Sequence, residues 1–190
     1  MAAMLERMDM DYVVYEQAEQ FGRVGAGIHL SPNVSKVFRP LGIEPELKRL
    51  AHRPSSWINR MADTGEVTFD HPLGDAMEAR FGAATLLMHR ADLHRTLSAL
   101  VAPARVQLGR RLAGLAPNGA GVKLEFADGS LKEIGSSDVP RAFAVYEATR
   151  KDRCTRVQEA SHANEFMRKP TDTDWLYRYD AWSEALALDT

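Results

Sequence analysis

The sequence is poor in cysteine, net charge and long apolar runs. Cys154 is the one cysteine in 190 residues, which excludes an intramolecular disulfide framework and a cysteine zinc cluster. The net charge of −2 gives no electrostatic case for binding nucleic acid or an anionic membrane. No apolar run approaches the length of a membrane span, and the charged start "MAAMLERMDMD" argues against a signal peptide. We therefore expect a soluble cytoplasmic protein without a metal site.

A complete dinucleotide-binding fingerprint is also missing. That motif is G-x-G-x-x-G, placed after a strand and opening a helix. The nearest stretch is "GAGIHL", residues 25–30, in which Leu30 occupies the place of the third glycine. That glycine lets the helix pack closely on the strand. On spacing alone, the stretch is more typical of a flexible loop with glycines at positive φ.

Glu16 ends the apolar run Tyr12–Tyr15, which has the composition of a short buried strand. In a Rossmann unit, an acid about 20 residues after the glycines binds the ribose hydroxyls. Counting back that far from Glu16 runs off the start of the sequence. Two interpretations stay open. Glu16 is a ribose ligand in a unit whose first strand and phosphate loop are missing, or it is a solvated acid at a strand end.

The remaining pattern predicts an α/β chain. Ser31-Pro32 predicts the start of a helix that ends near Gly42, and "HRADLHRTL" predicts another from about Ala91. Strand-like segments around 56–60 and 66–69 precede a β-meander over 106–134, whose turns contain Asn118-Gly119 and Asp128-Gly129. A long helix is expected from Val139 to Arg168, with an apolar stripe suited to covering a sheet.

Four segments, taken together, carry a family resemblance. They are "VVYEQAEQFGRVGAGIHLSPNVSKVFRPLG", "HRADLHRTL", "FADGS" and "AFAVYEATRKDRCTRVQEASHANEF". In this order they resemble the single-component FAD-dependent aromatic hydroxylases, the group that includes salicylate hydroxylase. The resemblance implies a partial Rossmann-like FAD-binding domain over residues 1–134. Residues 135–190 would be a C-terminal helical segment of the same domain.

The resemblance also implies departures from the family pattern. The opening strand with G-x-G-x-x-G is absent, as are the segment after "FADGS", the substrate-covering sheet and the later "GD" motif. "LKEIGSSDVPRAFAVYE" passes directly to the C-terminal helix, which places a junction near Ile134 to Asp138. We expect a chain that is clipped at its front and deleted in its centre.

Carried over by position, the resemblance assigns Glu16 and Gln17 to the adenosine ribose of FAD, and Arg23 and Arg90 to the flavin cofactor. His29 falls on the family's histidine beside the flavin ring, which would help to deprotonate a hydroxylated ring. From the residues alone, a loop histidine without a partner is the other interpretation of His29. His89 and His94 do not have the spacing of a helical metal pair and are expected to be surface or packing residues.

Two functions follow. The first is an FAD- and NAD(P)H-dependent monooxygenase that hydroxylates an aromatic or pyridine ring carboxylate, such as a salicylate- or 6-hydroxynicotinate-like substrate. The second is a non-catalytic remnant, either a weak nucleotide binder or an interaction partner. Because segments are missing, this chain is expected to be inactive. It is also expected to form homo-oligomers through exposed apolar surface.

Overall fold

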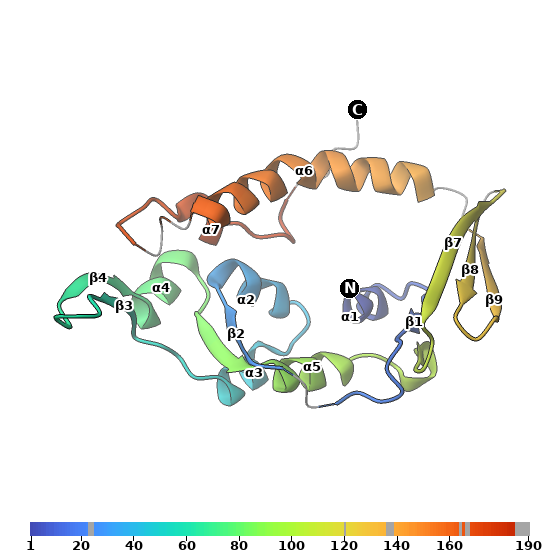
Figure 1. Cartoon of the computed structure of the whole chain (residues 1–190), viewed down its shortest axis with the longest axis horizontal. Helices are drawn as coiled ribbons and strands as arrows, with labels where there is room; N and C mark the ends of the chain where they lie inside the picture. Colours follow the sequence, from blue (N-terminus) through green and yellow to red (C-terminus); the bar gives the residue numbers. More distant parts are fainter. Residues whose placement is uncertain (23–24, 120, 136–138, 164, 166–167, 185–190) are drawn as a thin grey trace.

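The computed structural model describes residues 1–22, 25–119, 121–135, 139–163, 165 and 168–184 (Figure 1). The elements up to residue 98 are α1 (Ala2–Arg7), β1 (Val14–Tyr15), β2 (Gly27–Leu30), α2 (Pro32–Phe38), α3 (Glu44–Leu50), β3 (Ser56–Arg60), β4 (Val67–Pro72), α4 (Gly74–Phe81), β5 (Leu86–His89) and α5 (Arg90–Ser98). The later elements are the 3-10 helix η1 (Pro103–Arg105), β6 (Val106–Gln107), β7 (Leu112–Asn118), β8 (Gly121–Phe126), β9 (Leu131–Gly135), α6 (Val139–Ala163) and α7 (Asp174–Tyr177). None of the described helices is long and apolar enough to cross a membrane.

The main hydrophobic core lies where β2 and β5 meet the helices around them. The two strands pair antiparallel, with Gly27 opposite His89 and Leu30 opposite Leu86. The buried side chains of this core are Leu30, Phe38, Ile43, Leu47, Ala84, Leu86, Met88 and Leu93. Apolar residues that lie far apart in the sequence therefore fix β2 beside the start of α5.

Strand pairing confirms the mixed α/β class but not the Rossmann-like arrangement. The β2–β5, β3–β4 and β7–β8–β9 pairings are antiparallel, and the parallel pairing of β1 with β6 joins two residues on each strand. The prediction of a buried strand over Tyr12–Tyr15 was wrong. The strand is Val14–Tyr15, both residues are half-buried, and Val13 is exposed. Within the described residues, β6 is the only strand paired with β1, so this short pairing builds no larger sheet for other elements to cover.

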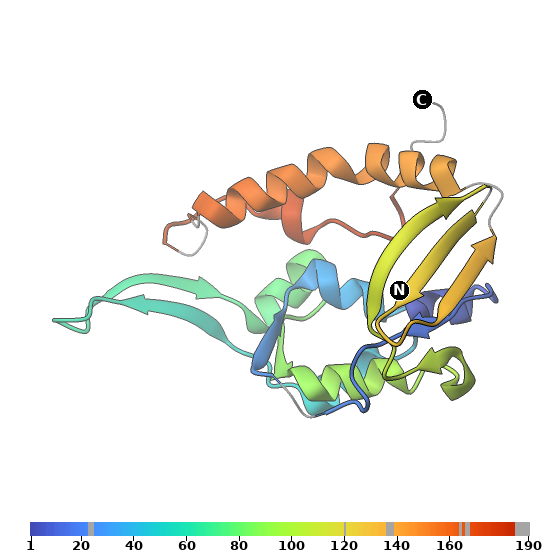
Figure 2. The ribbon, with the colours of Figure 1, turned by 45° about the vertical axis from the view of Figure 1, so that its right-hand side comes forward.

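The meander was predicted correctly from Leu112 onward, whereas Val106–Gln107 forms β6 and pairs in parallel with β1 instead. β8 pairs antiparallel with β7 on one side and β9 on the other. Gly119 and Gly129 adopt φ angles of 58° and 81°, a region that glycine enters without steric cost, so the predicted turn dipeptides do reverse the chain. Figure 2 shows this sheet at one side of the molecule and the β3–β4 hairpin projecting from the other.

The long C-terminal helix was predicted, but its end and its burial were not. α6 ends at Ala163, and among its residues with described side chains none is buried; Tyr146 is 61% exposed. The side chains of residues 139–143 and residue 166, part of the expected stripe, lie outside the described set. The segment after α6 packs instead, because Tyr177 is buried against Phe81 of α4 with ring centroids 5.4 Å apart.

Candidate functional site

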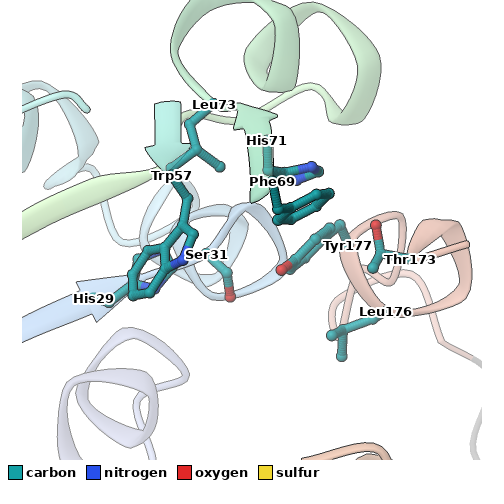
Figure 3. A pocket seen from close by; sticks show the side chains of 9 residues that line it. All are labelled: His29, Ser31, Trp57, Phe69, His71, Leu73, Thr173, Leu176 and Tyr177. Carbon is teal, nitrogen blue, oxygen red and sulfur yellow. The ribbon is translucent and has the colours of Figure 1, made fainter. Parts of the chain in front are cut away.

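A small aromatic cavity surrounds one face of His29. His29 lies on β2, opposite Leu87 of β5, and lines a cavity of about 200 Å³. The β3–β4 hairpin supplies Trp57 and His71, which are directly opposite each other in the ladder. Figure 3 shows Trp57 beside His29 at one end of this cavity, with the C-terminal segment at the other.

The walls of the cavity are mostly apolar. Phe69 stacks on His71, with ring centroids 5.9 Å apart and an angle of 15° between the rings. Tyr177, Leu176 and Thr173 close the cavity from the C-terminal segment (Figure 3). No Lys, Arg, Asp or Glu is among the described lining residues. Such walls suit a flat aromatic ring.

Three neutral groups in the cavity have unused hydrogen-bonding capacity. Within the described part of the chain, the His29 imidazole, the His71 imidazole and the Tyr177 hydroxyl have no hydrogen-bond partner. His29 is exposed on β2, yet partial desolvation by its neighbours still lowers its pKa. Burial is also the main cause that lowers the pKa of His71, and nearby Arg80 acts in the same direction. Burial raises the pKa of Tyr177. All three groups are therefore neutral at pH 7, and they can exchange hydrogen bonds with a ring hydroxyl.

The lowered histidine pKa values predict a loss of stability in mild acid. Between the folded pKa and the ordinary value of about 6.5, the unfolded state binds more protons than the folded state. The free energy of unfolding should therefore fall as the pH drops below about 6.5, and level off below the folded pKa values. Melting temperatures from pH 7.5 to 4.5 measure this fall. A double variant, His29→Asn with His71→Asn, should show a shallower fall, whereas substitution of the exposed His162 should not. An equal slope in all three proteins would contradict the assignment.

Arg90 lies against the glycine loop that precedes β2. Its backbone N–H donates to the Ala26 carbonyl at 3.2 Å. A Cβ added at Gly25 would lie 3.1 Å from the Arg90 Cδ, and Gly25 has a φ of 126°. Both observations explain the glycine at this position. Arg90 is exposed and makes no ion pair within the described residues, so its guanidinium is available to a ligand.

The glycines of "GAGIHL" lead into a strand. Gly25 has a positive φ, as the loop interpretation requires, whereas Gly27 begins β2 in extended conformation. A phosphate loop would open a helix and direct several N–H groups at the anion. The segment is therefore not a phosphate loop, as its spacing predicted.

Glu16 lies in a different hollow. Its carboxylate Oε1 accepts a hydrogen bond from the Ala18 N–H at 2.9 Å, and its backbone N–H donates to the Gln107 carbonyl at 3.0 Å. The side chain lines a groove of about 750 Å³ between α1, β1 and the exposed side of α5. Gln17 is exposed beside it. Arg23 lies outside the described residues.

The structure thus brings together some of the predicted residues and separates others. The β2–β5 ladder joins the segment of His29 to that of Arg90, while α5 extends from Arg90 to the groove that contains Glu16. Sequence reasoning missed Trp57, Phe69, His71 and Tyr177. The available signal was two ring-bearing residues two positions apart, Phe69 and His71, which share one face of β4; the predicted strand ended at Phe69 and so left His71 out.

The other two histidines considered have structural roles. His89 is the N-cap of α5, and its Nδ1 accepts a hydrogen bond from the Ala91 N–H at 3.1 Å. His94 packs edge-on against Phe21, with centroids 4.7 Å apart. The described residues contain no cluster of three or more potential metal ligands. The packing interpretation of both histidines agrees with these contacts.

Comparison with known proteins gives the lineage. No family model matches the chain. A 6-hydroxynicotinate 3-monooxygenase of Bordetella bronchiseptica is 40% identical over 132 residues, which cover 70% of this chain and 34% of the relative. A 3-amino-4-hydroxybenzoate 2-monooxygenase of Streptomyces cremeus is 38% identical over 156 residues, covering 78% of this chain and 40% of the relative.

The solved structures agree. Klebsiella pneumoniae HpxO, in complex with FAD and uric acid, matches with a TM-score of 0.62 and 25% identity, over 70% of this chain and 33% of that chain. Over about 70% of its length, the chain is homologous to flavin-dependent aromatic hydroxylases. It spans about a third of the length of the 6-hydroxynicotinate 3-monooxygenases that it matches. The family resemblance predicted from the four sequence segments is confirmed.

Proposed function

We propose that this chain derives from an FAD- and NAD(P)H-dependent monooxygenase that hydroxylates an aromatic or pyridine ring carboxylate, similar to 6-hydroxynicotinate or salicylate. The observation that carries the proposal is the position of His29, an exposed histidine on β2 that has no hydrogen-bond partner in the described structure and lines the aromatic cavity. The sequence similarity to 6-hydroxynicotinate 3-monooxygenase supports it.

In this proposal, His29 accepts the proton of the ring hydroxyl. A ring without that proton is richer in electrons and reacts more readily with an electrophilic oxygen. A histidine whose pKa is lowered by partial desolvation is in its basic form at pH 7, which suits this role. Trp57 and Phe69 offer apolar surfaces to the ring, although Trp57 is itself 39% exposed and does not seal the cavity from water. A flavin bound beside these residues would supply the oxygen-activating chemistry, with NAD(P)H as the reductant.

The described residues fit the two ends of FAD better than its centre. Glu16 offers carboxylate oxygens to the ribose hydroxyls, with Gln17 beside it. Arg90, unpaired within the described residues, offers donors to the cofactor near His29, and we propose that Arg23 does the same. The pyrophosphate requires backbone N–H groups at a helix N-terminus. "GAGIHL" does not provide these groups because it enters β2.

We further propose that residues 1–134 form a partial Rossmann-like FAD-binding domain. Residues 135–190 would be a C-terminal helical segment of the same domain. Contacts of the C-terminal segment with α2 support one domain. The Lys36 ammonium donates to the Tyr177 and Arg178 carbonyls at 3.2 and 3.0 Å. The proposed cellular location is the cytoplasm.

A second candidate function is a non-catalytic remnant that binds nucleotides weakly or associates with another protein. The absence of G-x-G-x-x-G from the 190 residues favours this candidate for the chain as it stands. The two candidates separate in one experiment. The family's front strand, phosphate loop and central segment are grafted from an intact relative, and NADH and NADPH oxidation is measured with and without 6-hydroxynicotinate or salicylate. Substrate-stimulated oxidation by the grafted protein would support descent from a hydroxylase. No such oxidation by the present chain would support the non-catalytic candidate for the chain as it stands.

Exposed apolar side chains on the β7–β8–β9 sheet predict self-association. Leu112, Leu115 and Ile134 stand opposite Phe126, Leu124 and Val122, so all share one face, yet the first three are 49, 64 and 44% exposed. Burying a large apolar side chain contributes about 1.5–3 kcal/mol. Light scattering should therefore show a mass above that of the monomer. Leu115→Lys should lower that mass, whereas Val67→Lys, on the separate hairpin, should not. A monodisperse monomer would contradict this prediction.

A further inference from the structure

A cluster of arginines lies on α6 and lines neither the cavity of His29 nor the groove of Glu16. The Arg153 guanidinium lies 3.5 Å from the centroid of the Tyr179 ring and donates to the Trp175 and Leu176 carbonyls at 3.1 and 3.2 Å. Arg156 lies 3.9 Å from the Trp175 ring centroid. These contacts hold the guanidinium groups in place before any ligand arrives.

The positive charge of the cluster is not balanced by ion pairs. Within the described residues, Arg150, Arg153 and Arg156 make no salt bridge. Burial lowers the pKa of Arg153, and the charges of Arg150 and Arg156 lower it further, although Glu184 opposes them. Repulsion among like charges that are held this close is relieved by an anion.

A cavity of about 460 Å³ opens beside these arginines. Its lining includes Arg150, Arg153, Gln158, Ser161, His162 and Tyr179. The Tyr179 hydroxyl is buried and has no hydrogen-bond partner in the described structure. Arginine donates two parallel hydrogen bonds to phosphate, and Arg150 and Arg153 lie about one helical turn apart. A rise of about 12 Å along the helix separates Arg153 from Ser161.

We propose that this cavity binds a nucleoside diphosphate. The two phosphoryl groups contact Arg150 and Arg153, where three of the five donors of Arg153 and all five of Arg150 are unused. The nucleoside extends along α6, where Gln158, Ser161 and His162 offer polar groups to its hydroxyls. The volume lies within the range of small-molecule sites and exceeds what phosphate alone needs.

Calorimetric titration of the full chain with ADP tests this proposal. We expect saturable binding that Arg150→Gln weakens about tenfold or more, because charge-assisted hydrogen bonds are lost. Arg150 makes no hydrogen bond within the described protein, so its loss leaves the fold intact. Lys151→Gln is the matched control. It removes the same charge from the next residue, which pairs with Glu147 and does not line the cavity, so it should change the affinity less than about twofold at 0.15 M salt.

Several results would overturn the proposal. One is the absence of ADP binding to the unaltered chain, and another is an equal loss with Arg150→Gln and Lys151→Gln. If pyrophosphate binds as tightly as ADP, the nucleoside contributes nothing to the affinity and the site does not recognise it. Loss of ADP binding on Glu16→Gln, with none on Arg150→Gln, would place the nucleotide in the groove beside α5. Because the measurement needs neither FAD nor turnover, its outcome is independent of the hydroxylase proposal.

Discussion

The purified 190-residue chain is expected to be colourless. The pyrophosphate of FAD normally gains several charge-assisted hydrogen bonds from a glycine loop and a helix N-terminus. Each contributes about 1.5–3 kcal/mol. Without two of them the affinity should fall by roughly 3–6 kcal/mol, or about two to four decades. Glu16 and Arg90 do not offset a loss of that size. Flavin absorbance after gel filtration measures the result.

A titration with added FAD makes this prediction sharper. Weak binding through the two ends of the cofactor should weaken further on Arg90→Gln. Arg49→Gln is the control, because Arg49 lies on α3, lines neither the cavity of His29 nor the groove of Glu16, and is already paired with Glu46 at 2.7 Å. FAD that stays bound at one equivalent through gel filtration would show that the phosphate loop is dispensable.

The second large effect is on turnover. The present chain should show no substrate-stimulated NADH oxidation with 6-hydroxynicotinate or salicylate, because the flavin is not held and the ring is not fully shielded from water. The protein that carries the grafted strand, loop and central segment should be active. In it, His29→Asn should lower kcat by about 10²–10⁴-fold, the usual contribution of general acid–base catalysis. FAD affinity should change little, since His29 serves the substrate ring.

The pH dependence of the grafted protein separates catalysis from simple packing. A base with a lowered pKa predicts a rate that falls in acid as His29 takes up a proton. That acid limb should disappear in His29→Asn, while His162→Asn should retain it. Turnover by the present 190-residue chain that is lost on His29→Asn would instead show that the remnant hypothesis is wrong.

Local signals in the sequence predicted the elements better than their burial. Ser31-Pro32 marked the start of α2, and the Asn-Gly and Asp-Gly dipeptides marked the meander turns, because these residues fix backbone conformation by themselves. Burial depends on what lies across from an element. The Tyr12–Tyr15 run has the composition of a covered strand, but one neighbouring strand is present in the described structure. The exposed α6 was mispredicted for the same reason.

The candidate site shows the same limit. Position within a family motif singled out His29 and Arg90, and the β2–β5 ladder does bring their segments together. Trp57, His71 and Tyr177 reach His29 from a hairpin and from the far end of the chain. No local sequence pattern predicts that these side chains line one cavity, because this depends on how the β3–β4 hairpin is oriented and on how α7 packs. The sequence singled out none of the α6 arginines, because Trp175 and Tyr179, whose rings they contact, belong to a later segment of the chain.

The β2–β5 ladder also determines where this chain can be cut and rejoined. Everything from residue 27 to residue 89 is enclosed between the two strands. Side chains alternate between the faces of a strand, so deleting one residue within β2 would turn His29 away from its cavity. Circular permutants and inserted tags should therefore spare both strands. The exposed turn at Thr64–Gly65, at the tip of the projecting hairpin, is the better site for a new pair of termini (Figure 2).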